Sequence, residues 1–137
     1  MFRDIKDNLD NSQVKRILLA YDPRHTPESY IAKFQAQPLR SVYGWVTNGE
    51  VLGICGFEVL KEYILLTDLG VDESMRGRGI GSAMIDAMQD LFGLPINAET
   101  DDDAVEFYRK IGFDISEAPP KHGTRRWALW RDLSNSL

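Results

Sequence analysis

A glycine-rich segment joins an apolar stretch to an amphipathic one, and this junction limits what the chain can form. Residues 63–71 are apolar on both faces over much of their length, which is typical of a central strand covered on both sides. Residues 80–92 repeat apolar side chains at helical spacing without interruption. Between them lies Arg76-Gly77-Arg78-Gly79-Ile80-Gly81. The sequence therefore predicts a central strand, a tight loop and a long helix in succession.

The remaining segments predict an α+β (mixed α/β) fold. Helices are expected over residues 14–21 and 27–37, where apolar residues recur at helical spacing and proline follows each segment. A fourth, short helix is expected over residues 104–111, with Asp101 as its N-cap. Strands are expected over residues 41–46, 51–60, 63–71, 95–100, 113–115 and 124–131. The predicted order is α-α-β-β-β-α-β-α-β-β.

Composition favours one soluble domain over residues 1–137. A chain of 137 residues, 43% of them hydrophobic, is long enough to bury a core. Its net charge of −5 disfavours nucleic-acid partners, and no apolar stretch reaches the length of a membrane helix. The N-terminus has no signal-peptide pattern, and Cys55 is the only cysteine, so we expect a cytoplasmic protein. His25 and His122 lack metal-ligand spacing, so no metal is expected.

The glycine-rich segment has the properties of a phosphate-binding loop. Glycines let backbone N–H groups approach a ligand closely, and the helix that follows presents its positive end there. Arg76 and Arg78 add positive charge. A Walker loop is excluded because no lysine follows Gly81. A dinucleotide fingerprint is excluded because Ser82 or Met84 would occupy its third glycine position.

Two motifs in register resemble the GNAT (Gcn5-related N-acetyltransferase) family. Arg76, Gly79 and Gly81 match the family's acetyl-CoA loop, Gln/Arg-x-x-Gly-x-Gly/Ala. Residues 104–113 resemble its A-x-x-x-Y-x-x-x-G-F helix. The resemblance covers residues 41–131 and implies a mostly antiparallel, twisted central sheet flanked by helices. The family's first strand is expected to be short or absent here, and Asp101 stands where the family often has asparagine.

The resemblance implies acetyl-CoA as co-substrate. Its pantetheine arm would pair with the backbone of Leu69 and Val71, and residues 76–82 would hold its pyrophosphate. The residues expected to bind the cofactor are Leu69, Gly70, Val71, Arg76, Gly77, Arg78, Gly79, Ile80, Gly81 and Ser82.

The resemblance also implies catalytic roles. Tyr108 matches the family's tyrosine and is the expected general acid for the leaving thiolate. Leu65 occupies the position where some relatives carry a glutamate base. Glu99 is therefore placed first as a base and Asp68 second, because strand alternation turns Asp68 away from the face of Leu65 unless a bulge intervenes. A water chain without a dedicated base is a further alternative.

The function implied is transfer of acetyl from acetyl-CoA to a primary amine by direct attack in a ternary complex. A non-catalytic acyl-CoA-binding or interaction domain on the same fold is the alternative. The acceptor would be a small-molecule or peptide amine bound near residues 21–26, and the acidic composition suits a cationic one. A homodimer stays open.

Overall fold

The computed structural model describes residues 1–133 and contains one seven-stranded sheet. Its strand order is β1-β2-β3-β4-β5-β7-β6, and every neighbouring pair is antiparallel except β4 and β5. The predicted α+β architecture is confirmed. The strands are β1 (Phe2–Asp4), β2 (Ser41–Thr47), β3 (Glu50–Val59), β4 (Ile64–Val71), β5 (Ile96–Thr100), β6 (Asp114–Lys121) and β7 (Thr124–Arg131).

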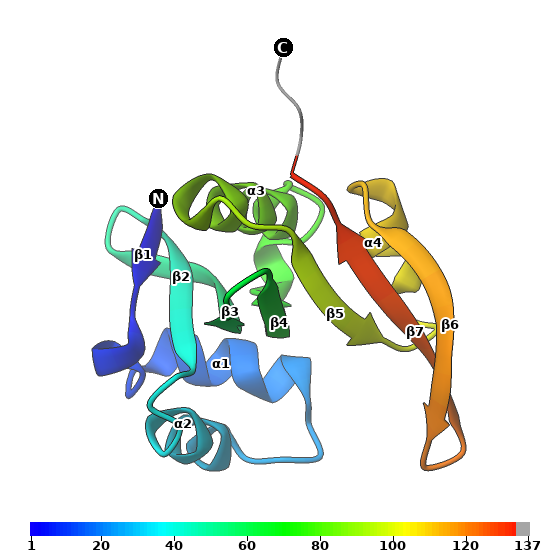
Figure 1. Cartoon of the computed structure of the whole chain (residues 1–137). Helices are drawn as coiled ribbons and strands as arrows, with labels where there is room; N and C mark the ends of the chain where they lie inside the picture. The colour runs from blue at the N-terminus through cyan, green and yellow to red at the C-terminus, as the bar shows by residue number, and fades with distance from the viewer. Residues whose placement is uncertain (134–137) are drawn as a thin grey trace.

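Four α-helices pack on the sheet, with α1 and α2 together and α3 and α4 apart from them (Figure 1). Their bounds are α1 (Ser12–Tyr21), α2 (Pro27–Gln35), α3 (Ile80–Phe92) and α4 (Val105–Lys110). One apolar cluster joins Ile17 of α1 and Phe34 of α2 to β2 and β3. A second cluster joins Met84 of α3 to β3, β4 and β5. Within residues 1–133, no helix has both the length and the apolar character needed to cross a bilayer.

The helix starts follow from the capping residues that the sequence provides. The Asn11 side chain accepts a hydrogen bond from the Val14 N–H, and the Thr26 side chain accepts one from the Ser29 N–H. Both contacts satisfy N–H groups that lack an intrahelical partner. Pro27 occupies the first turn of α2, where its missing N–H costs nothing.

Strands β4 and β5 separate after a short parallel contact (Figure 1). They pair only at Ile64–Ile96 and Leu65–Asn97. Beyond that point β4 continues along β3 as far as Val71, while β5 continues along β7. The separation leaves the far half of β4 with an open edge, and the candidate site is built on this edge.

A β-bulge in β4 changes which side chains face each helix layer. Phe57 pairs with Leu66 and Gly56 pairs with Asp68, so Thr67 is an additional residue in β4. Leu66 lies in the cluster under α3. A Cβ at Gly70 would lie 3.2 Å from the Ile17 side chain of α1, so the even-numbered positions face α1 after the bulge. Strand alternation predicts that Asp68 points away from the face of Leu65 unless a bulge intervenes, and this bulge is present.

The first strand, expected to be short or absent, is present and has three residues, and Phe2 pairs with Trp45. The structure corrects two predicted boundaries. The last-but-one strand, expected over residues 113–115, extends to Lys121. It contains Pro119 and Pro120, which a strand tolerates here because β6 lies at the edge of the sheet, next to an irregularity in pairing.

The second correction concerns the start of α4. Asp101 was expected to be its N-cap, but α4 begins at Val105 and its capping position is Ala104. Asp101 Oδ1 instead accepts hydrogen bonds from the N–H groups of Asp103 and Ala104, at 3.0 and 3.2 Å. The aspartate therefore stabilises a turn that precedes the helix.

Candidate active site

Two cavities open beside the free edge of β4, and they meet at Leu69 and Tyr108. One has a volume of about 440 Å³ and lies between α1, the end of β4, the glycine-rich loop and α4. The other has a volume of about 840 Å³ and lies between the α1–α2 connection, β4 and β5. The residues that line both are Ala20, Tyr21, Leu69, Arg76, Ala104 and Tyr108.

The glycine-rich loop borders the smaller cavity with open backbone. Gly77 and Gly79 have φ angles of +78° and +79°, a conformation that favours glycine. A Cβ at either position would meet no atom within 4 Å. Gly79 caps α3 without a side-chain hydrogen bond, so the first N–H groups of α3 remain available. The loop therefore fits a pyrophosphate group.

Not every residue of the glycine-rich loop borders a cavity. A Cβ at Gly81 would lie 2.9 Å from the Phe107 ring, so this glycine allows α3 to pack closely against α4. Arg76 lines both cavities. Arg78 and Ser82 line neither, and Arg78 is exposed.

Asp72 anchors the start of this loop, a role that the sequence analysis missed. Its carboxylate accepts hydrogen bonds from the N–H and hydroxyl of Ser74, at 3.0 and 2.7 Å, and from Arg16 Nε at 2.9 Å. Hydrogen bonds from Ser74, followed by those from Arg16, hold the pKa of Asp72 below its usual value. The Asp-x-Ser spacing is typical of such a turn and could have indicated it.

The open edge of β4 carries the backbone groups of Leu69 and Val71. The Asp72 N–H donates to the Leu52 carbonyl at 2.9 Å, so the backbone of Asp72 is hydrogen-bonded to the β3 side. Such positions alternate along an antiparallel pair, so Leu69 and Val71 direct their N–H and C=O groups away from β3. No strand within residues 1–133 pairs with that edge beyond Leu65.

Tyr108 lies on α4 at the junction of the two cavities. Its ring packs against Phe107 and Phe113, with centroid separations of 5.1 and 5.2 Å. Burial, reinforced by the negative charges of Asp68 and Asp101, raises the pKa of Tyr108 to about 12. The hydroxyl therefore carries its proton at neutral pH.

Asp68 lies in the larger cavity because of the bulge, with a side chain that is 12% exposed. Its carboxylate accepts hydrogen bonds from the Thr67 hydroxyl at 2.7 Å and the Tyr21 hydroxyl at 3.3 Å. Arg40 Nη1 lies 3.6 Å from Oδ2. Burial, and next the negative charge of Asp68, raise the pKa of Tyr21, so this tyrosine is a donor to the carboxylate.

Glu99 lines the same cavity from β5 in a different setting. Its side chain is 39% exposed, and Oε1 lies 3.6 Å from both Lys121 Nζ and Arg126 Nε. Both partners are cations that neutralise the carboxylate. The structure thus brings Asp68, Leu69 and Tyr108 together at the junction of the cavities and engages Glu99 in ion pairs.

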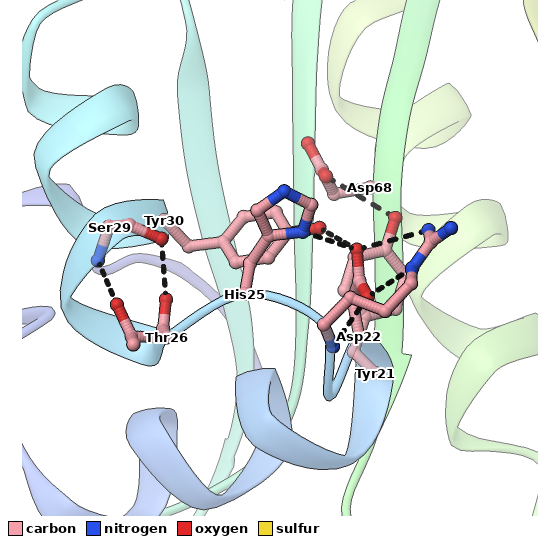
Figure 2. Close-up of polar contacts among 8 residues, drawn as sticks. Tyr21, Asp22, His25, Thr26, Ser29, Tyr30 and Asp68 are labelled. Carbon is pink, nitrogen blue, oxygen red and sulfur yellow. Dashed lines mark hydrogen bonds and ion pairs between the residues drawn. The ribbon is translucent and has the colours of Figure 1, made fainter.

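Asp22 organises the α1–α2 connection (Figure 2), and this connection forms one wall of the larger cavity. Its carboxylate accepts hydrogen bonds from the Tyr30 hydroxyl at 2.8 Å and from Arg24 Nε at 3.0 Å, and it contacts His25 Nδ1 at 3.0 Å. These contacts, with Arg24 contributing most, hold the pKa of Asp22 well below its usual range. The sequence predicts an acceptor near this connection but gives no sign of the network, because the members of the network are not periodic.

Charge in the larger cavity is predominantly negative. Its lining includes three arginines and five carboxylates, namely Asp22, Asp68, Glu99, Asp101 and Asp103. A cavity lined this way attracts cations. Asp101 lines this cavity alone and not the smaller one, so the aspartate that replaces the expected asparagine lies on the acidic side of the junction.

The splayed sheet and the phosphate-fitting loop define a protein of the acyl-transferring class. A sequence model described as the Acetyltransferase (GNAT) family matches residues 11–113. The chain therefore belongs to the GNAT family of acetyltransferases, as its two motifs predicted.

Similar proteins agree with this assignment. An uncharacterized N-acetyltransferase of Shouchella clausii (strain KSM-K16) is 38% identical over 58 residues, which are 42% of this chain and 34% of that protein. The match thus spans about a third of the relative's length. Aminoglycoside 6'-acetyltransferase type Ii has a TM-score of 0.80 at 19% identity, covering 100% of this chain and 99% of its own. An aminoglycoside 6'-N-acetyltransferase complexed with coenzyme A has a TM-score of 0.75 at 17% identity, covering 95% and 94%.

Proposed function

We propose that residues 1–137 act as one N-acetyltransferase that moves acetyl from acetyl-CoA to a primary amine. The observation that carries this proposal is the meeting of two cavities at Leu69 and Tyr108. One cavity contains the glycine-rich loop and the other is acidic, so a cofactor and a cationic acceptor can be bound on opposite sides of one point. Binding both substrates at this point would place the amine next to the thioester. The amine could then attack directly in a ternary complex, without a covalent intermediate on the enzyme.

The cofactor side would bind acetyl-CoA through backbone groups. The N–H groups at Gly77, Gly79 and the start of α3 would hold the pyrophosphate, with Arg76 adding charge. Leu69 and Val71 would pair with the pantetheine amides, since their backbone groups point away from β3. An N–H on this edge would also polarise the thioester carbonyl and stabilise the oxyanion.

We assign the role of general base to Asp68 in place of Glu99. A lysine-like amine has a pKa of about 10.4 and must lose a proton before it attacks. Asp68 is 12% exposed, lies beside Leu69 and has one cation, Arg40, at 3.6 Å, whereas Glu99 is 39% exposed and has two cations at that distance. The carboxylate would take the proton directly or through one water molecule.

Tyr108 would donate to the leaving sulfur. A tyrosine whose pKa is about 12 stays protonated across the working pH range, so the donor is always present. Its position at the junction of both cavities is the position that this role requires.

The acceptor is proposed to be a small cationic amine. The larger cavity has a volume of about 840 Å³ and is net acidic, which suits a molecule with one or more ammonium groups. Two structurally similar proteins are aminoglycoside acetyltransferases, which supports a small-molecule amine as the acceptor. A cytoplasmic location is favoured because acetyl-CoA would be supplied there and because the single cysteine, Cys55, is a buried free thiol.

Free CoA thiol, followed with a panel of amines, tests the proposal. The panel should contain polyamines, aminoglycosides, amino acids and peptides with a free N-terminus. Turnover with a small cationic amine is the expected result. Thermal stabilisation by acetyl-CoA without turnover on any amine would instead support the alternative, a non-catalytic acyl-CoA-binding module.

Two isosteric variants test the choice of base. Asp68→Asn is expected to lower kcat/KM at least 100-fold, while Glu99→Gln is expected to retain activity within about threefold. The reverse pattern would restore Glu99 as the base. Equal and small effects of both would favour a water chain without a dedicated base.

A further inference from the structure

The Thr67 hydroxyl lies between two hydrogen-bond acceptors. Its Oγ1 is 2.7 Å from Asp68 Oδ2 and 2.9 Å from the Gly56 carbonyl oxygen. A hydroxyl has one proton, so it can donate to only one of these oxygens at a time. Thr67 is also the additional residue of the bulge, and this placement puts its side chain beside that of Asp68.

This geometry suits both protonation states of Asp68. An ionised carboxylate only accepts, so Thr67 then donates its proton to Oδ2. A protonated Oδ2 becomes a donor to Thr67 Oγ1, and Thr67 can turn its own proton to the Gly56 carbonyl. Asp68 therefore keeps a hydrogen bond at Oδ2 whether or not it carries a proton, and only hydroxyl rotation is required.

The other groups around Asp68 do not provide this exchange. Arg40 carries donors only and is shared with Glu58, at 3.4 Å. Tyr21 contacts the opposite oxygen, Oδ1, at 3.3 Å. The titratable and charged groups that face or influence Asp68 from the surrounding elements are Tyr21, Tyr30, Arg40, Cys55, Glu58 and Tyr108.

We propose that Thr67 is a positioning residue that lets Asp68 accept the proton of the acceptor ammonium and release it again without losing a hydrogen bond. The proposal rests on the proposed function, in which Asp68 is the base. In the step concerned, the ammonium N–H bond breaks, the proton joins Asp68 Oδ2, and the nitrogen keeps the electron pair with which it attacks. The proton later passes from Asp68 to solvent, which restores the carboxylate.

Thr67→Val and Thr67→Ser form a matched pair for the test. Valine keeps the β-branched shape that suits a strand but removes the hydroxyl, whereas serine keeps the hydroxyl. A hydrogen bond to a charged oxygen is stronger than one to a neutral group, so its loss disfavours the ionised base. We expect Thr67→Val to move the acid limb of the kcat/KM profile to higher pH by about one unit and to lower kcat about 10-fold. Thr67→Ser should restore both values to near wild type.

A second readout separates this proposal from the assignment of the base. The carboxyl carbon of Asp68, observed by NMR in protein labelled at aspartate and assigned with Asp68→Asn, gives its titration midpoint without catalysis. A midpoint that rises in Thr67→Val but not in Thr67→Ser supports the coupling. A midpoint unchanged in Thr67→Val, or shifted equally in both variants, overturns it. A shifted midpoint with an unshifted kinetic limb overturns Asp68 as the base and leaves the coupling supported.

Discussion

Gly56 faces the carboxylate of Asp68 with no room between them for a side chain. A Cβ at this position would be 2.8 Å from Asp68 Oδ2, closer than real Cβ atoms approach, and 3.3 Å from Thr67 Oγ1, a tight contact. The two residues are partners across β3 and β4 at the bulge. The absence of a side chain at Gly56 thus makes room for the carboxylate that we assign as the base.

Gly56→Ala is expected to displace Asp68 and lower kcat/KM about 10-fold or more. The carboxylate is on a short side chain, so the added methyl group moves it away from Thr67 and the cavity. Gly44→Ala is the matched control, because its Cβ would lie 2.9 Å from the Ile5 side chain, also on the sheet but outside both cavities. Steady-state kinetics and melting temperatures should show similar stability losses but a loss of activity in Gly56→Ala alone. Equal activity of the two variants would contradict this reading.

Gly79→Glu is expected to weaken acetyl-CoA binding at least 100-fold. The φ angle of +79° disfavours any side chain, and a carboxylate there would enter the space next to the first N–H groups of α3. Gly49→Glu is the matched control, since Gly49 has a φ angle of +78° and equally open space, but lies in the β2–β3 turn. Isothermal titration calorimetry with acetyl-CoA should separate the two. Comparable affinity in both variants would remove the loop from the cofactor site.

The sequence was sufficient for features that are encoded locally. The apolar spacing of residues 80–92 specified α3, because helical periodicity is a property of neighbouring side chains. Asn48-Gly49 is a dipeptide typical of two-residue hairpin turns, and both residues adopt positive φ in the β2–β3 turn. The loop at Gly77 and Gly79 was recognised for the same reason, since its conformation and its motif coincide.

Features that depend on distant parts of the chain could not be predicted in this way. The bulge at Thr67 depends on how β3 and β4 align, so sequence alternation alone could not decide which face of β4 carries Asp68. The length of β6 depends on its place at the sheet edge, where Pro119 and Pro120 do no harm. Both features arise from tertiary pairing rather than from local propensity.

Tyr108→Phe is expected to lower kcat by about 10- to 100-fold and leave the acetyl-CoA affinity nearly unchanged. The ring keeps its packing against Phe113, and only the donor to sulfur is lost. Because an acid must be protonated and its pKa is raised to about 12, Tyr108 should produce no falling limb in the pH profile below about pH 10. Tyr63→Phe is the control, as Tyr63 packs on Trp130 outside both cavities. Wild-type turnover in Tyr108→Phe would exclude it as the proton donor.

Asp22→Asn is expected to destabilise the fold by about 1–2 kcal/mol at pH 7, because its 11% exposed carboxylate accepts several charge-assisted hydrogen bonds. Its folded pKa lies below the unfolded value of about 3.9, so this stabilisation is complete well above pH 4 and is lost as the pH falls through the folded pKa. Chemical denaturation should therefore show a difference between wild type and variant that is constant from pH 6 to 8 and narrows below pH 4. Asp10→Asn removes a carboxylate that is 85% exposed and should leave the melting temperature unchanged. A difference that widens on acidification would contradict the assigned network, since the variant has no charge to lose there.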